Sequence, residues 1–206
     1  MQNTHQVNLM CTNDMFPVEF LDVYDDGFNF QALIDVDDID GPVRGDSFRK
    51  TPQCYSGLIH NKDNKYLILG DNSQFEVQNL TIQQICLPDC KFNFQFYDES
   101  GHKVRKGSAV ILYAIKNDRK MVVCCNDKRK IQPKEMDIPE KIEATKHEAV
   151  FYMTPVTEGT KKYMLESSLY PYEFLGFEPA KNNCQLTLVL HRKVDEVDER
   201  CQITLS

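Results

Sequence analysis

The 206-residue sequence has no tryptophan, no long apolar run and no basic-then-apolar leader at its N-terminus. A membrane-spanning helix needs roughly 18 consecutive apolar residues, and a secretory signal needs a short basic segment followed by an apolar one. The sequence therefore predicts a protein that is made in the cytosol and does not insert into membranes.

The motifs of the common nucleotide and metal sites are missing as well. There is no GxGxxG, no GxxxxGK and no HExxH, since the pair His147-Glu148 is not followed by a second histidine. The five histidines are dispersed, and no aromatic-basic motif of RNA-binding domains occurs. We therefore expect no metal, no cofactor and no nucleic-acid partner, and a protein that is not an enzyme.

The eight cysteines show no CxxC spacing. Without a secretory signal, scattered cysteines are more typical of reduced thiols than of a disulfide framework. Cys124 and Cys125 lie in an apolar stretch, which favours small buried side chains over a catalytic thiol. A thiol enzyme remains an alternative, because a base could approach in space.

Charge is distributed unevenly along the chain. Residues 1–46 hold ten acidic residues against one basic residue, a net charge of −9, whereas residues 47–206 hold 23 basic against 21 acidic residues, a net charge of +2. The simplest interpretation is that residues 1–46 form a solvated acidic tail. A composition boundary this sharp also predicts two parts: an acidic segment 1–46 and a domain 47–206.

The acidic segment is itself divided. Residues 16–21 and 28–34 are apolar enough for short strands that pack, whereas residues 35–46 are acidic, with two glycines and a proline. Such a composition predicts an exposed, extended linker, and exposed linkers are preferred sites of proteolysis.

From residue 47 onward, short β runs alternate with polar turns. Alternation is clear at Phe92, Phe94 and Phe96, which point to one face of a strand. We predict strands at 55–59, 66–69, 75–80, 92–97, 109–115, 121–125, 131–136, 150–153, 163–166, 174–177, 186–190 and 202–205. Residues 139–146 are the only segment of this domain for which the sequence predicts helical turns. About twelve strands in three blocks of four predict an all-β domain, best fitted by a pseudo-threefold β-trefoil, with a β-sandwich close behind.

Three basic clusters, at 103–106, 128–130 and 161–162, fall in predicted turns. Charged turn tips often serve solubility alone. Alternatively they meet an acidic partner surface, where loop charges give steering and specificity rather than chemistry.

Several stretches resemble the interleukin-1 family. They are KEMDIPEKIEATK at 134–146, the aromatic strand AVFY at 149–152, ESSLY at 166–170 with EFL at 173–175, SAVI at 108–111, FPVEFLD at 16–22 and SFRK at 47–50. The resemblance spans nearly the whole chain, and it implies a β-trefoil preceded by a pro-segment.

The resemblance further implies a cytosolic precursor that an inflammatory caspase cuts after an aspartate. The aligned bond joins Asp46 to Ser47, and the rival joins Asp40 to Gly41. The released domain would be secreted without a signal peptide. It would bind, as a monomer, a two-chain immunoglobulin-type receptor and trigger inflammatory or interferon-inducing signalling, and a soluble binding protein is a possible further partner.

By position in the sequence, the resemblance implies receptor contacts at Lys50, Asp63, Arg105 and Lys106. Two alternatives stay open. A receptor antagonist of the same family would bind one receptor chain without signalling, and an intracellular β-trefoil binding module would show threefold repeated ligand residues, which the sequence lacks.

Overall fold

The computed structural model describes residues 18–24, 27–32, 47–100, 107–144, 146–179, 186–192 and 198–206. The chain divides into two compact units, Met1–Val43 and Arg44–Ser206, which are described here separately. The predicted boundary after Asp46 lies close to this division. Asp40, Gly41, Asp46, Arg105 and Lys106 lie outside the described residues.

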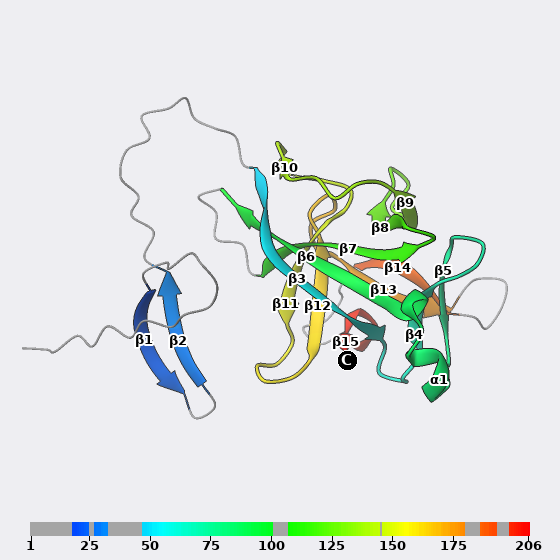
Figure 1. The fold of residues 1–206 in the computed structure, drawn as a ribbon, viewed down its shortest axis with the longest axis horizontal. Coiled ribbons are helices and arrows are strands. Elements are labelled where there is room, and N and C mark those ends of the chain that lie inside the picture. The colour runs from blue at the N-terminus through cyan, green and yellow to red at the C-terminus, as the bar shows by residue number, and fades with distance from the viewer. Residues whose placement is uncertain are drawn as a thin grey trace, which may run out of the picture. The chain divides into compact units, whose positions relative to one another are not determined.

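The first unit contains an antiparallel hairpin. Strand β1 (Val18–Tyr24) pairs with β2 (Gly27–Ala32), with one irregularity in the register between Phe20 and Asp22 (Figure 1). Both apolar runs of the acidic segment thus contribute strands, which pair with each other; the predicted packing of these runs on the following domain stays a prediction.

The second unit is built around a closed ring of six strands: β3 (Phe48–His60), β6 (Lys91–Glu99), β7 (Ser108–Lys116), β11 (Val150–Pro155), β12 (Lys162–Ser167) and β15 (Ile203–Leu205). Each pairs with the next, and β15 pairs with both β12 and β3 (Figure 1). The ring closes because the last strand of the chain returns to the first strand of the unit.

Three hairpins complete this unit. They are β4 (Tyr66–Leu69) with β5 (Phe75–Gln78), β8 (Arg119–Cys125) with β9 (Ile131–Glu135), and β13 (Glu173–Pro179) with β14 (Leu186–Arg192). Each third of the unit thus contributes two ring strands and one hairpin. This is the β-trefoil, and the predicted three blocks of four strands are confirmed.

Two buried clusters form the core. The larger contains Phe92, Phe94 and Leu188, as the alternation predicts, and the smaller contains Phe48, Ile142 and other residues on the opposite face of β7 and β8. The adjacent cysteines separate: Cys125 packs into the larger cluster and Cys124 into the smaller one. Successive residues of a strand point to opposite faces, so Cys124 and Cys125, although adjacent in the chain, each pack into a different core cluster.

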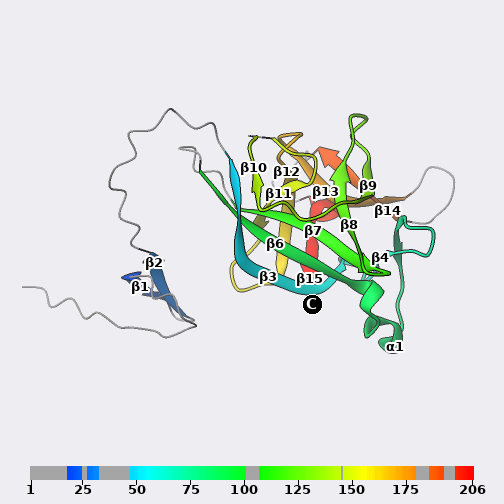
Figure 2. The ribbon, with the colours of Figure 1, turned by 45° about the horizontal axis from the view of Figure 1, so that its top comes forward.

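The helical turns predicted over 139–146 are wrong. The segment contains the short strand β10 (Lys141–Ile142), which pairs with Phe48 and Arg49 at the start of β3 (Figure 2). Ile138 and Ile142 are buried in the smaller cluster. Burying both residues and supplying a hydrogen-bonding partner for β3 outweighs the local helix preference of the sequence.

The sequence did not predict α1 (Ile82–Ile85), a single helical turn followed by the 3-10 turn η1 (Pro88–Cys90). Thr81 begins α1 with a capping box: its hydroxyl accepts a hydrogen bond from the Gln84 amide, and the Gln84 side chain accepts one from the Thr81 amide. The spacing Thr-x-x-Gln is the local signal that would have revealed it.

Candidate functional site

The start of β3 is held on both sides. The Ser47 amide donates to Ser100 Oγ at 3.1 Å, and the Ser47 carbonyl accepts from the Ser100 amide at 3.0 Å. Phe48 is 1% exposed, with its ring centroid 6.3 Å from that of Tyr152. Lys50 Nζ lies 2.5 Å from Glu140 Oε1 in the segment that leads into β10. Ser47, the first described residue of the domain, is therefore held by hydrogen bonds to Ser100.

Immediately after Lys50, β3 bulges. The register with β6 shifts between Lys50 and Cys54, which includes Pro52, a residue with no amide to donate. The buried Gln95 of β6 supports the bulge, since its Nε2 lies 2.7 Å from the Thr51 carbonyl oxygen and 2.9 Å from that of Gln53. Bulges re-aim side chains and are common beside functional sites.

A pocket of about 250 Å³ opens beside this bulge. Its walls are Thr51 and Gln53 of β3, the end of β6 from Phe96 to Glu99, and Gly107 to Ala109 at the start of β7. Asp98 and Glu99 bring carboxylates to it. Lys50 lies at the end of the bulge, and predicted residues Arg105 and Lys106 directly precede Gly107 in the chain.

Asp63 is not brought to the same place. It follows β3 in the turn before β4, where its amide donates to Asn61 Oδ1 at 3.0 Å. Its neighbour Lys62 Nζ lies 2.5 Å from Glu199 Oε2. Lys50 and Asp63 thus flank opposite ends of a 13-residue strand, so they cannot belong to one small contact.

A second surface joins two loops, the tip of the β8–β9 hairpin (126–130) and the β12–β13 turn (169–173). Tyr170 Oη donates to the Asn126 carbonyl at 2.8 Å. Arg129 Nη1 lies 2.8 Å from Glu173 Oε1, and its guanidinium carbon lies 5.5 Å from the Tyr170 ring centroid. We call residues 126–130 and 169–173 the paired-loop surface.

Tyr172 is the most prominent side chain of this surface. It is 74% exposed and has a φ of 67°, a backbone conformation unfavourable for any side chain larger than glycine. Arg129 also has a positive φ, of 60°. Strained backbone persists where the surrounding structure enforces it, often at functional positions. The sequence marked the basic residues 128–130 but missed Tyr172, whose only signal is an aromatic residue directly after a proline.

The motif Glu166-Ser-Ser-Leu-Tyr170 organises the paired-loop surface from beneath. Glu166 Oε1 accepts from the Tyr172 amide at 2.8 Å, and Ser167 Oγ accepts from the Tyr170 amide at 3.2 Å. The buried Ser168 hydroxyl donates to the His147 carbonyl at 2.9 Å. This part of the motif is therefore structural.

Nothing in the described ranges forms a reactive centre of the kind considered from the sequence. Burial raises the pKa of the Cys124 and Cys125 thiols to about 12, so both are protonated and weakly nucleophilic at neutral pH. Cys54, Cys86, Cys124 and Cys125 are free thiols, and Cys11 and Cys184 lie outside the described ranges. Within those ranges no cluster of metal ligands occurs, and none of their helices has the length and hydropathy of a membrane span.

Comparison with known proteins places these features in a family. The model of the interleukin-1/18 family matches residues 83–201. Mouse interleukin-18 is 27% identical over 186 residues, which cover 86% of this chain and 92% of the mouse protein.

Solved structures agree on the fold. A mutant of chicken (Gallus) interleukin-1 beta is 20% identical with a TM-score of 0.57, and the match covers 77% of this chain and 99% of that one. The structure of chicken interleukin 1 beta is 19% identical with a TM-score of 0.55, over the same shares. From the family match, which spans more than half of the sequence, the chain is a member of the interleukin-1/18 family of cytokines.

Proposed function

We propose that this protein is a pro-inflammatory cytokine precursor, activated by cleavage after Asp46, whose domain 47–206 binds a two-chain immunoglobulin-type receptor. Membership of the interleukin-1/18 family and similarity to mouse interleukin-18 support this proposal. The precursor stays in the cytosol, and the processed domain leaves the cell without a signal peptide. A soluble binding protein would compete for the same surfaces.

The observation that supports the proposal is that the domain has two separate surface features suited to binding another protein. One is the pocket beside the β3 bulge, built from β3, β6 and β7. The other is the paired-loop surface, which carries the exposed side chains of Tyr172, Lys128 and Lys130. Exposed tyrosines and arginines on rigid supports are typical of the residues that dominate protein–protein binding energy. Two receptor chains need two such surfaces.

A signalling assay separates the proposal from the antagonist alternative. Cells that carry both chains of an interleukin-18-type receptor and a reporter gene are treated with the 47–206 chain. Activation supports an agonist. Binding to one receptor chain without reporter activity supports an antagonist, and no binding to either chain would exclude both.

The proposed processing has its own test. The full chain is incubated with an inflammatory caspase, and the new N-terminus is sequenced. A product that begins at Ser47 supports the aligned bond, one that begins at Gly41 moves the cut, and the absence of any cut contradicts the proposal.

Comparing receptor binding by the full chain and by residues 47–206 tests whether the acidic segment also suppresses activity. The segment has a net charge of −9 and the domain a net charge of +2, and opposite net charges attract. Equal affinity of the two chains would contradict masking.

A further inference from the structure

Both backbone polar groups of Ser47 are bound to one residue. Its nitrogen donates to Ser100 Oγ at 3.1 Å, its carbonyl accepts from the Ser100 amide at 3.0 Å, and the two hydroxyls lie 2.9 Å apart. In the proposed cleavage after Asp46, the Ser47 nitrogen is the leaving group of the bond that breaks. The leaving group is therefore already held by the folded domain.

The residues that follow are held more firmly. Phe48 is opposite Glu99 of β6 on one side and Ile142 of β10 on the other, and its side chain is buried. The Lys50 amide donates to the Glu140 carbonyl at 3.0 Å. Residues 47–50 thus enter the sheet directly after the proposed cut.

A protease binds its substrate as an extended strand in its own cleft, so a segment that is already paired must first leave the fold. We propose that the pairing of residues 47–50 with β6 and β10 limits the rate at which the Asp46–Ser47 bond is cut, and that Ser100 and Phe48 set that rate. This inference rests on the proposed function and deepens it, because processing then requires the start of β3 to open locally.

The rival bond supplies an internal control. Asp40–Gly41 precedes Ser47, the first described residue of the domain, by six positions, so loosening the start of β3 should leave its cleavage rate unchanged. The ratio of the two cleavage rates within one chain therefore reports the local effect, independently of protease concentration.

The test uses the full chain with a limiting amount of an inflammatory caspase, so that cleavage follows the population of the open form. Ser100→Ala should raise the rate at Asp46–Ser47 about fivefold, because one hydrogen bond of ordinary net strength corresponds to roughly that factor. Phe48→Leu should raise it about tenfold through lost packing. Ser56→Ala, at an exposed position of β3, and Phe92→Leu, in the larger core cluster, are the matched controls.

A peptide of residues 41–52 separates failure of this inference from failure of the proposed processing. Rapid cutting of the peptide at Asp46, slower cutting of the full chain and selective acceleration by the two variants support the inference. If Ser100→Ala and Phe48→Leu leave the rate at Asp46 unchanged, or if Phe92→Leu accelerates it as much as Phe48→Leu, the inference is wrong. If neither the peptide nor any full chain is cut at Asp46, the proposed processing at this bond itself fails.

Discussion

Tyr172 combines two properties that rarely occur in one residue, a left-handed backbone and a side chain that is 74% exposed. A left-handed conformation costs a non-glycine residue roughly 1–2 kcal/mol. The bond from its amide to Glu166 and the bracing of its neighbour Tyr170 against Asn126 enforce that conformation. The backbone conformation of Tyr172 therefore lowers the stability of the domain, while its aromatic ring stays exposed.

Replacing Tyr172 by glycine should separate stability from binding. Because glycine adopts this φ without strain, we expect the free energy of unfolding to stay unchanged or to rise by up to about 1 kcal/mol. Receptor affinity should fall at least about tenfold through loss of the ring. Chemical denaturation and surface plasmon resonance measure the two effects.

Ser73→Gly is the control, since Ser73 also has a positive φ, of 56°, in the turn between β4 and β5. It should leave affinity unchanged. If Tyr172→Gly bound the receptor as tightly as the wild-type chain, Tyr172 would not belong to the contact.

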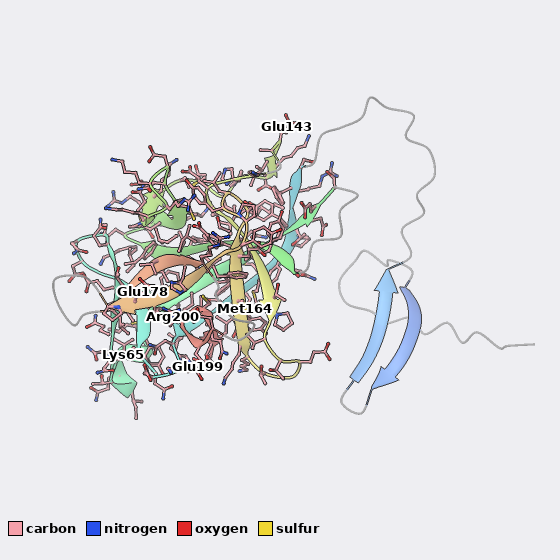
Figure 3. All side chains as sticks on the ribbon, turned by 180° about the vertical axis from the view of Figure 1, so that it is seen from behind. Lys65, Glu143, Met164, Glu178, Glu199 and Arg200 are labelled. Atoms are coloured by element: carbon pink, nitrogen blue, oxygen red, sulfur yellow. The ribbon has the colours of Figure 1, made fainter. Side chains whose placement is uncertain are left out.

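Asp198 is the second informative single residue. Its Oδ1 accepts from the Arg200 amide at 3.1 Å and from Arg200 Nε at 3.0 Å, and its Oδ2 lies 2.9 Å from Arg200 Nη2 and 3.3 Å from His191 Nε2. Figure 3 shows Arg200 together with Glu178, whose Oε1 lies 2.6 Å from His191 Nδ1. Hydrogen bonds from Arg200 hold the pKa of Asp198 below its usual value of 3.8.

The lowered pKa of Asp198 makes stability depend on pH. A carboxylate whose pKa is lower in the folded chain stabilises the fold above its ordinary pKa, and that contribution disappears as the pH falls through and below that range. Asp198→Asn should therefore lower Tm by roughly 2–6 °C at pH 7, and the difference from wild type should shrink as the pH falls from 5 towards 3.

Thermal melts at several pH values measure this effect. Asp71→Asn is the matched control, because Asp71, which pairs with Lys116, is fully exposed, and ion pairs of exposed carboxylates contribute little. A Tm difference for Asp198→Asn that stays constant with pH would contradict the assigned role.

Among the elements, β7 shows how closely the strands approach one another. Gly107 precedes β7 with a φ of +105°, and a Cβ placed on it would lie 2.5 Å from Thr154 Oγ1 and 2.7 Å from the Met153 carbonyl oxygen. Gly107 also lines the pocket beside the β3 bulge. Close packing of β7 on β11 and the shape of this pocket therefore depend on one glycine.

Gly107→Ala should lower the free energy of unfolding by about 2–4 kcal/mol, because backbone strain and a steric clash add. Gly159→Ala, at an exposed turn glycine with a φ of 72°, should cost only about 1 kcal/mol from the backbone alone. Equal losses for the two variants, measured by urea denaturation, would show that the predicted clash is relieved by movement.

Most elements were predictable from local pattern, and the exceptions have physical reasons. Strands that alternate in polarity, such as β6 and β14, coincide with their predicted ranges to within one or two residues. The segment around β10 was wrongly predicted as helical because its two buried isoleucines lie in the same core cluster as Phe48, about ninety residues earlier in the chain. The β3 bulge was equally invisible, since its support, Gln95, becomes meaningful only when β6 lies beside β3.

At the scale of the whole molecule, the sequence pattern could not predict that the ring of six strands closes. The three-residue strand β15 pairs with Ile59 and His60 of β3 and with Lys162 and Tyr163 of β12. Strand counts suggested the three blocks of four. That count fitted a trefoil only slightly better than a sandwich, and the resemblance to the interleukin-1 family decided between them. The same limit applies to the paired-loop surface, whose two loops are about forty residues apart in sequence.

Closure at β15 predicts that the last strand is essential. Ile203 is fully buried in the larger core cluster, so Ile203→Ala should cost about 2–5 kcal/mol, enough to leave much of the domain unfolded at 37 °C. Thr204→Ala, on the half-buried face of the same strand, should cost less than about 1 kcal/mol. Thermal melts followed by circular dichroism distinguish the two variants. A small loss of stability in Ile203→Ala would show that the ring does not depend on the packing of β15.

Strand β9 ends the hydrogen-bonded order of the larger sheet and carries Pro133, opposite Val123, at its centre. An unpaired strand edge is a template for chain-to-chain association, and a proline there removes a donor that an incoming strand would need. Concentrated copies of this domain are thus protected from joining edge to edge, and replacing Pro133 with valine would be expected to promote fibrillar aggregation without altering the fold of a single molecule.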